Sequence, residues 1–289
     1  MEAVIASLVL ASACLHPLRD LFLKGIKFPE SAYLGVVLLW VPLAAIHAWV
    51  FDISLLPVGT AWPLILASAF GLFLYYVGVQ AAMVRGDLSI YYPIIRSAPL
   101  FIVVTGVMVL GHKYSPTLLF GIALTWIGAF FLQYRRGGRF FQDPQTLGIA
   151  FMAMAGHGVT ALADAKAMQS IEPMVLMFWV NILVIVFCGA YFALRRPPHR
   201  SRGLHLLAAW RTAPMLIIAV AVMSYMSYLM ILIAFQFGGD VAAVSALRQV
   251  SIPISVILGG LYLKESSPAR RFYWAVVLSV GVVVIILSR

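Results

Sequence analysis

Long apolar runs, separated by short polar turns, follow one another along the whole chain. Each run is close to the roughly 20 residues that a helix needs to cross a hydrocarbon core of about 30 Å. The pattern therefore predicts an all-α integral membrane protein with about ten transmembrane helices. The expected segments are residues 3–24, 32–51, 61–84, 90–111, 115–134, 147–168, 173–194, 213–236, 241–263 and 271–288.

The composition agrees with lipid as the solvent of this chain. Of the 289 residues, 63% are hydrophobic and 10% are charged, and the mean hydropathy is +1.00. The net charge of +10 comes from short basic clusters between apolar runs, where Lys and Arg anchor helix ends, so we expect no nucleic-acid partner. Cys14 and Cys188 each lie inside an apolar segment, and we interpret them as packing residues.

A set of polar markers recurs with a period of about 152 residues. The first half contains Gly86-Asp87, Arg96 and Ser115-Pro116, and the second contains Gly239-Asp240, Arg248 and Ser267-Pro268 in the same order. This indicates a duplicated five-helix unit, with halves at 1–140 and 141–289. Because five is odd, the second copy would enter the membrane from the opposite face. The result would be an inverted repeat, which is typical of transporters.

The segment from Gly71 to Gln133 and its counterpart from Ser224 to Leu287 resemble the EamA domain of the drug/metabolite transporter superfamily. The features that carry the resemblance are Gly86-Asp87 at the start of the fourth segment and Leu263-Lys264-Glu265 at the end of the ninth. The resemblance covers nearly the whole chain. It implies a ten-helix fold of two EamA halves around a central cavity.

The family that the chain resembles exports amino acids and other metabolites, and it is similar to the nucleotide-sugar and triose-phosphate carriers. The chain departs from the family pattern at two places. His16-Pro17 stands where the first helix of the family tends to have Trp-Gly, and His112-Lys113 replaces a customary Glu after the fourth helix. The substrate is therefore not inherited by analogy.

Basic residues are distributed unequally between the two sides of the predicted membrane span. The odd-numbered loops contain 14 Lys and Arg residues, whereas the opposite side has Lys113 and the terminal Arg289. The positive-inside rule places the odd-numbered loops in the cytoplasm and both termini outside, in what we expect to be a bacterial inner membrane. The family resemblance implies both termini inside, and we follow the charge count.

Four basic residues fall inside the predicted segments, namely Arg19, Arg96, Lys166 and Arg248. An Arg at a helix centre costs about 2.5 to 3.5 kcal/mol on insertion scales, so it normally faces a cavity or a partner. Arg96 and Arg248 are each followed by a proline, Pro99 and Pro253, which weakens the helical hydrogen-bond ladder. We predict that these two arginines line a central cavity and bind a carboxylate or phosphate group.

Acidic and imidazole side chains in the predicted helices offer a second set of candidates. Asp20 or Asp164 could instead neutralise the arginines and hold helices together, and this alternative stays open. His157 and Asp164 lie two turns apart on nearly one face, and in a cavity they could relay a proton. We assign His16 to substrate binding, and His157, Asp164 and Asp20 to proton coupling. The alternative is that both histidines form hydrogen bonds across helix interfaces.

Tyrosines could supply a polar lining for the cavity. Our candidates are Tyr92, Tyr225 and Tyr228, of which the last two are three residues apart and share a helix face. The weaker candidates are Tyr75, Tyr76, Tyr91, Gln80, Asn181 and Gln236. The alternative role for several of these tyrosines is in interfacial belts or in helix packing.

Motifs of familiar enzymes and pumps do not occur in the sequence: it contains no GxxxxGK[ST], HExxH, CxxC or GxSxG. We therefore expect a secondary transporter without a cofactor or resident metal, which moves a small metabolite bearing an anionic group by alternating access. The alternatives are a flippase for a lipid-linked or phosphate-bearing amphiphile, and a membrane-embedded enzyme acting on lipid head groups. Membrane lipid is a further partner, and a homodimer is one of the assemblies that the sequence allows.

Overall fold

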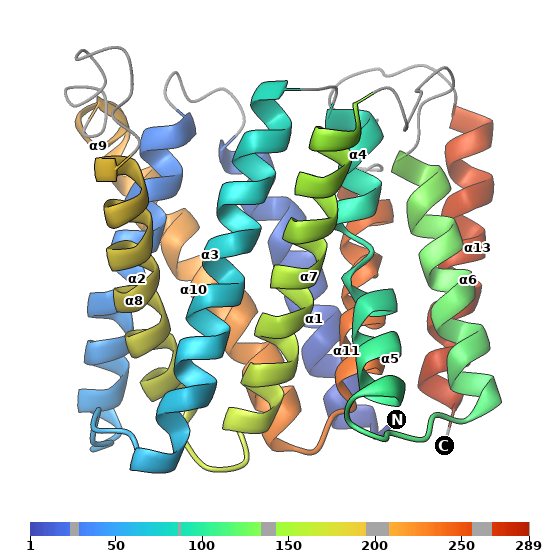
Figure 1. Ribbon diagram of the computed structural model, residues 1–289, viewed down its shortest axis with the longest axis horizontal. Coiled ribbons are helices and arrows are strands. Elements are labelled where there is room, and N and C mark those ends of the chain that lie inside the picture. Colours follow the sequence, from blue (N-terminus) through green and yellow to red (C-terminus); the bar gives the residue numbers. More distant parts are fainter. Residues whose placement is uncertain (24–28, 86–87, 134–142, 195–207, 256–267, 289) are drawn as a thin grey trace.

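The computed structural model describes residues 1–23, 29–85, 88–133, 143–194, 208–255 and 268–288. Within these ranges every regular element is a helix, without a strand (Figure 1). The helices are α1 (Ala3–Leu23), α2 (Pro29–Val50), η1 (Gly59–Ala61), α3 (Trp62–Arg85), α4 (Leu88–Ile95), α5 (Ala98–Met108), α6 (Pro116–Gln133), α7 (Pro144–Ala167), α8 (Pro173–Leu194), α9 (Ala208–Thr212), α10 (Pro214–Gln236), α11 (Val241–Leu247), η3 (Arg248–Val250) and α13 (Pro268–Leu287). They stand side by side as one bundle (Figure 1).

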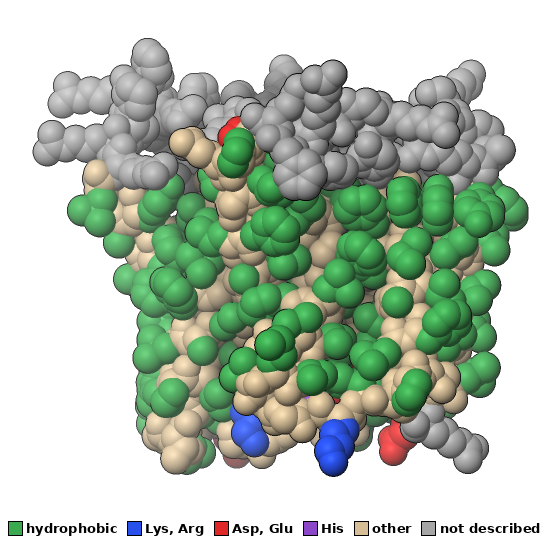
Figure 2. All heavy atoms as spheres, turned by 45° about the vertical axis from the view of Figure 1, so that its right-hand side comes forward, with side chains coloured by type: hydrophobic (Ala, Val, Ile, Leu, Met, Phe, Trp, Pro, Cys, Tyr) green, Lys and Arg blue, Asp and Glu red, His purple; other side chains and the backbone are tan. Residues whose placement is uncertain are grey.

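Five of the described helices are long and apolar enough to cross a membrane. They are Gly59–Ala82, Tyr91–Met108, Pro144–Ala167, Pro173–Tyr191 and Pro214–Gln236. Five shorter apolar helices of 10–17 residues accompany them. Figure 2 shows a wide belt of hydrophobic side chains on the described surface, with charged groups at its lower edge and an acidic side chain near its upper edge. This is the surface of an all-α protein suited to lipid, and the count of ten spans stays a prediction.

The helix positions follow the apolar runs closely. Every described helix end that corresponds to a predicted segment end lies within three residues of it, whereas the end of the ninth segment falls outside the described residues. Helices α6, α7, α8, α10 and α13 begin with proline, which has no amide hydrogen to leave unpaired in a first turn. Asp143 caps α7 by accepting from the amides of Gln145 and Thr146 at 3.0 and 3.2 Å.

Two predicted helices are interrupted, which is a correction to the continuous segments expected at 90–111 and 241–263. The first stops at Ile95 and starts again at Ala98. In the second, α11 stops at Leu247 and a 3₁₀ turn follows over Arg248–Val250. Pro99 occupies the first turn of α5, where its missing amide costs least. Each interruption therefore includes one of the two membrane arginines.

Helices that are far apart in the sequence pack against each other in pairs. The pairs are α3 with α7, α6 with α13, α1 with α10, α2 with α8, and α5 with α11. Helix α1 runs upward from the lower edge in Figure 1, whereas α7 runs downward toward the same edge.

Two of these pairs approach backbone to backbone through glycines. A Cβ added at Gly71 of α3 would lie 2.6 Å from the carbonyl oxygen of Gly156 on α7, and one at Gly128 of α6 would lie 2.6 Å from the amide nitrogen of Leu278 on α13. We call these the glycine interfaces. Small residues are what allow helices to pack this closely in a membrane.

The ends of α1, α3, α6 and α8 that border the basic loops lie at the same edge of the bundle (Figure 1). The markers Gly86-Asp87, Ser267 and Leu263-Lys264-Glu265 lie outside the described residues.

The prediction that Lys166 is one of the basic residues inside the membrane is corrected by the structure. Lys166 is exposed in the last turn of α7 and donates to the side-chain oxygen of Gln169 at 2.8 Å, so it joins Lys113 on the side opposite the basic loops.

Candidate functional site

The two helix interruptions meet in the interior of the bundle. The side-chain amide of Gln249 donates to the main-chain oxygen of Arg96 at 2.7 Å. In return, Nη2 of Arg96 donates to the hydroxyl of Ser251 at 3.0 Å. The guanidinium carbon of Arg96 also lies 5.9 Å from the ring centroid of Tyr92, one turn earlier. Each interruption thus supplies partners for groups at the other.

A buried carboxylate on α7 joins three helices. Asp164 is 2% exposed and accepts a hydrogen bond from the hydroxyl of Ser68 on α3 at 2.5 Å. It accepts a second from the phenol of Tyr228 on α10. The hydroxyl of Thr160 on α7 donates to the main-chain oxygen of Ser68 at 3.1 Å, which holds α3 and α7 in register beside the acid. A buried carboxylate with only neutral donors is expensive unless a cation is near.

That cation is Arg248, whose charge acts on Asp164, on the phenol of Tyr228 and on His157. The charge of Arg96 also acts on His157. These interactions link five side chains, which we call the polar cluster. Its members are Arg96, His157, Asp164, Tyr228 and Arg248.

Several buried polar atoms at the polar cluster have no hydrogen-bond partner within the described part of the chain. They are Nε of Arg96, Nδ1 of His157 and Oε1 of Gln249, together with Nε1 of Trp40 beside Tyr228. The His157 ring is stacked on Tyr75 with centroids 4.9 Å apart. Native proteins rarely leave buried donors and acceptors unpaired, and a bound ligand is one way to satisfy them.

The tyrosine candidates divide between two places. Tyr228 belongs to the polar cluster, whereas Tyr225 bonds through its hydroxyl to Nδ1 of His47 on α2 at 2.9 Å. Trp40 packs on both rings, with centroid distances of 6.1 Å to Tyr225 and 5.6 Å to Tyr228, so the two share a face as their spacing predicts. Tyr92 lies beside Arg96.

The predicted relay from His157 to Asp164 has no direct hydrogen bond among the described contacts. Asp164 is engaged by Ser68 and Tyr228, and His157 is stacked on Tyr75. His16 is half-buried on α1, which packs against the turn that begins with Arg248. The side chains of Arg19 and Asp20 lie outside the described part of the chain.

Four of the weaker candidates for a polar lining do not belong to the polar cluster. Gln80 and Gln236 are exposed, and the side chain of Gln236 donates to Glu172 at 3.1 Å. Asn181 is buried but donates to the carbonyl oxygen of Met177 in its own helix at 2.7 Å. Tyr91 is buried in an apolar cluster with Ile95. These residues lie apart from the hydrogen bonds that join the polar cluster.

Sequence reasoning missed five residues that the structure places at or beside the polar cluster. They are Trp40, His47, Ser68, Gln249 and Ser251. Gln249 carried a usable signal, because it is a polar residue directly after Arg248 inside an apolar segment. Ser68 carried none, since a serine in a membrane helix commonly bonds to its own backbone.

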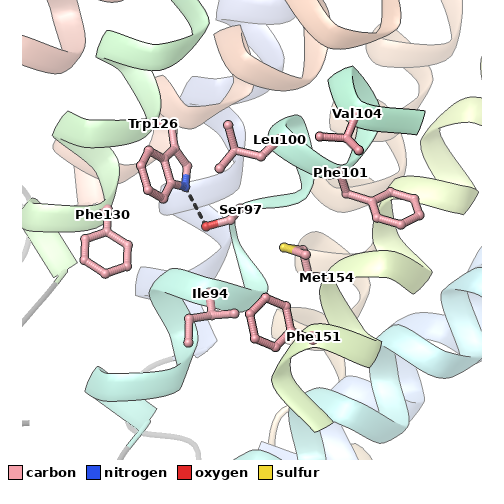
Figure 3. A pocket seen from close by; sticks show the side chains of 9 residues that line it. All are labelled: Ile94, Ser97, Leu100, Phe101, Val104, Trp126, Phe130, Phe151 and Met154. Carbon is pink, nitrogen blue, oxygen red and sulfur yellow. Dashed lines mark hydrogen bonds between the residues drawn. The ribbon is translucent and has the colours of Figure 1, made fainter. Parts of the chain in front are cut away.

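An apolar pocket lies beside the first interruption. It has a volume of about 300 Å³ and is lined by Ile94, Ser97, Leu100, Phe101, Val104, Trp126, Phe130, Phe151 and Met154 (Figure 3). Its polar groups are already paired. The indole nitrogen of Trp126 donates to the hydroxyl of Ser97 at 2.6 Å, and that hydroxyl donates to the carbonyl oxygen of Pro93 at 2.7 Å.

No family model matches this chain, and no curated protein matches it. A solved protein crystal structure is similar to it with a TM-score of 0.75 and 15% identity, over 100% of this chain and 99% of that chain. At this identity the likeness concerns the fold alone. The helical bundle as a whole is therefore an arrangement already seen in a solved structure.

Proposed function

We propose that the protein is a secondary transporter of the drug/metabolite transporter superfamily, with two EamA halves, which moves a small solute bearing an anionic group by alternating access. The observation that carries the proposal is the contact between the two interrupted helices, each with an arginine at its break. Interrupted helices that meet inside a membrane protein are characteristic of solute sites in secondary transporters.

The helix pairing supports an inverted repeat with halves at 1–140 and 141–289. If the halves correspond in order, α1 matches α7, α2 matches α8, α3 matches α10, α4 with α5 matches α11 with η3, and α6 matches α13. Exchanging the halves turns the pair α3–α7 into α10–α1, and it returns α2–α8 and α6–α13 to themselves. All of these pairs pack together, and α1 and α7 run in opposite directions, as a pseudo-twofold axis in the membrane plane requires (Figure 1).

The polar cluster can couple an anion to a proton. Arg248 acts electrostatically on Asp164, so an anionic solute and the Asp164 carboxylate compete for the same cation. A proton taken up by Asp164 removes that competition and favours anion binding. The same group then loses its proton when the solute leaves, which links transport to the proton gradient.

Transport by purified protein in proteoliposomes tests the proposal. Small carboxylates and phosphates are supplied as labelled solutes, and uptake is followed with and without a pH gradient. Arg96→Gln and Arg248→Gln remove a guanidinium, whereas Lys113→Gln, at an exposed lysine away from the cluster, is the control. We expect uptake of at least one solute that both arginine variants reduce by about tenfold or more and that the control retains. Normal transport by both arginine variants would overturn the anion-binding role.

The same preparation separates transport from chemistry. In detergent there is no compartment, so a transporter leaves each solute unchanged, whereas a membrane-embedded enzyme converts a substrate. Mass spectrometry of the solutes after incubation in detergent makes this distinction. Appearance of a product would overturn the transporter proposal in favour of an enzyme acting on head groups.

The proposed orientation places the basic loops in the cytoplasm of a bacterium and both termini outside. Lys166 belongs with Lys113 on the less basic side, and the charge bias remains strong. Lys113→Cys in a Cys14→Ser background gives an exposed thiol on that side. We expect an impermeant maleimide to label it in intact cells. Labelling only after the membrane is opened would reverse the orientation.

A further inference from the structure

The apolar pocket beside Ser97 is suited to hydrocarbon. Its side chains are apolar apart from Ser97 and Trp126, which bond to each other and leave no donor unpaired there. A volume of about 300 Å³ is at the small end of the roughly 300 to 1,000 Å³ usual for small-molecule sites. A polar ligand would lose its hydrogen bonds to water on entering, whereas an alkyl chain would lose none.

The pocket has an entrance on the lipid-facing side of the bundle. Val104 and Phe151 line it and are 54% and 49% exposed. They lie on α5 and α7, at positions where exposed apolar side chains face the bilayer. Figure 3 shows the aromatic rings of Phe101, Phe130 and Phe151 around the space between α5, α6 and α7. Hydrocarbon can therefore enter from the membrane without crossing water.

The pocket lies near the polar cluster, whose residues are not themselves part of the pocket lining. Ile94 and Ser97, which line it, flank Arg96 in the first interruption. Met154 lines it one turn before His157 on α7, and Phe101 lies against Gly158 at the same level. Nε of Arg96 and Nδ1 of His157 are among the buried atoms without a partner in the described residues. An apolar chamber open to lipid thus lies near Nε of Arg96, a cationic donor without a partner in the described residues that is suited to an anion.

We propose that this pocket holds the hydrocarbon tail of an amphiphile whose anionic head is bound at Arg96. The inference rests on the proposed function and narrows its solute to anionic amphiphiles that enter from the bilayer. Head and tail would be separated by about one helical turn of α7, from His157 to Met154. The aliphatic part would be short, because the pocket is small.

Photo-crosslinking locates the tail directly. The probe is decyl phosphate with a diazirine near the end of its chain, and the matched probe is the uncharged decanol with the same diazirine. Both are bound to the full chain in nanodiscs, and the adducts are mapped by mass spectrometry. We expect saturable labelling of α5 and α7 at the pocket lining by the phosphate. It should saturate at a concentration at least about tenfold lower than the alcohol, the factor expected for hydrogen bonds to a charged group.

Two tryptophan variants on one helix provide the matched test. Val104→Trp fills the pocket from its exposed rim, whereas Val107→Trp adds the same bulk at a 49% exposed position outside the lining. We expect the first to reduce saturable labelling by about fivefold or more and the second to leave it unchanged. Arg96→Gln should abolish the preference for phosphate over alcohol.

The possible results separate this inference from the proposed function. Unsaturable labelling that is equal in both tryptophan variants would place the tail in bulk lipid and overturn the inference. Saturable labelling that ignores the head group and Arg96 would make the pocket an ordinary lipid site, which also overturns it. In either case, uptake of a short anion that depends on Arg96 and Arg248 would leave the proposed function standing.

Discussion

Helix α7 takes part in two interfaces of opposite character. At the glycine interface, Gly156 meets Gly71 of α3 with no room for a Cβ atom. The next residue, His157, belongs to the polar cluster, where a buried nitrogen has no partner within the described chain. Backbone packing fixes one position of α3 relative to α7, whereas hydrogen bonds and charges permit several arrangements. The glycine interface is therefore a rigid support of α7, whereas the polar cluster beside it is a site that can rearrange.

The largest loss of stability should follow from disrupting the glycine interface. Gly156→Leu would drive a side chain into the carbonyl oxygen of Gly71 and the backbone of Tyr75, so we expect destabilisation of about 3 kcal/mol or more. Gly148→Leu is the control, because it lies on the same helix and no atom of the described residues lies within 4 Å of its Cβ position. Thermal unfolding followed by size-exclusion in detergent measures both. Equal melting temperatures of the two variants would contradict the conclusion that the glycine interface is a rigid support.

Arg248→Gln should affect transport strongly and folding less, because Asp164 can take up a proton and so need not remain a buried charge without a cation. It removes the cation that acts on Asp164, His157 and Tyr228. A lost hydrogen bond to a charged group is worth about 1.5 to 3 kcal/mol, which corresponds to roughly a 10- to 150-fold loss of uptake. Uptake rate and melting temperature are measured on the same preparation. If the variant is unfolded, Arg248 is needed for folding, and the polar cluster is then no less structural than the glycine interface.

Asp164→Asn should separate exchange from proton-driven accumulation. The amide keeps the shape, but it cannot take up a proton. Its oxygen accepts from one of the two hydroxyls, of Ser68 or Tyr228, and its nitrogen donates to the other. We expect counterflow exchange to stay within about threefold of the unmodified protein, whereas accumulation driven by a pH gradient is lost. Radiolabelled solute in both assays gives the answer. Loss of both activities together would instead make Asp164 a structural group.

Tyr225→Phe should have the smallest effect. It removes a hydrogen bond to His47 beside the polar cluster, which we expect to cost about 1 kcal/mol of stability and less than about threefold in uptake. Tyr228→Phe, on the same face of α10, removes a donor to Asp164 and should lower proton-driven uptake more. If Tyr225→Phe is the more harmful of the two, the site extends to α2 and is wider than the polar cluster.

The positions of the helices could be predicted because each is an unbroken apolar run with polar ends, and lipid allows no other backbone arrangement there. The interruptions could not be placed in advance. Pro99 indicated weakness near the first break, yet the chain leaves the helix at Arg96, where Gln249 supplies a partner for the freed carbonyl oxygen. That partner is more than 150 residues away in the sequence, so only tertiary structure reveals it.

The polar cluster was partly predictable for a related reason. Arg96, Arg248 and Asp164 are noticeable as charges in apolar runs, and such charges must find partners. The identity of those partners depends on which helices pack together. Ser68 meets Asp164 because the glycine interface brings α3 against α7, and nothing in the local sequence of Ser68 indicates this. The spacing places Tyr225 on the same face as Tyr228, but the hydroxyl of Tyr225 bonds to His47, whereas that of Tyr228 bonds to Asp164.

The hydrogen bond from Gln249 to the main chain of Arg96 has a consequence for biogenesis. The ribosome delivers Arg96 to the membrane long before Gln249 and Ser251 are synthesised, so the nascent first half holds a cation and a free carbonyl group in lipid. Each such group costs several kcal/mol until it is satisfied. Insertion of the first half should therefore pause in a shallow or chaperoned state, and its maturation should wait for translation of the second.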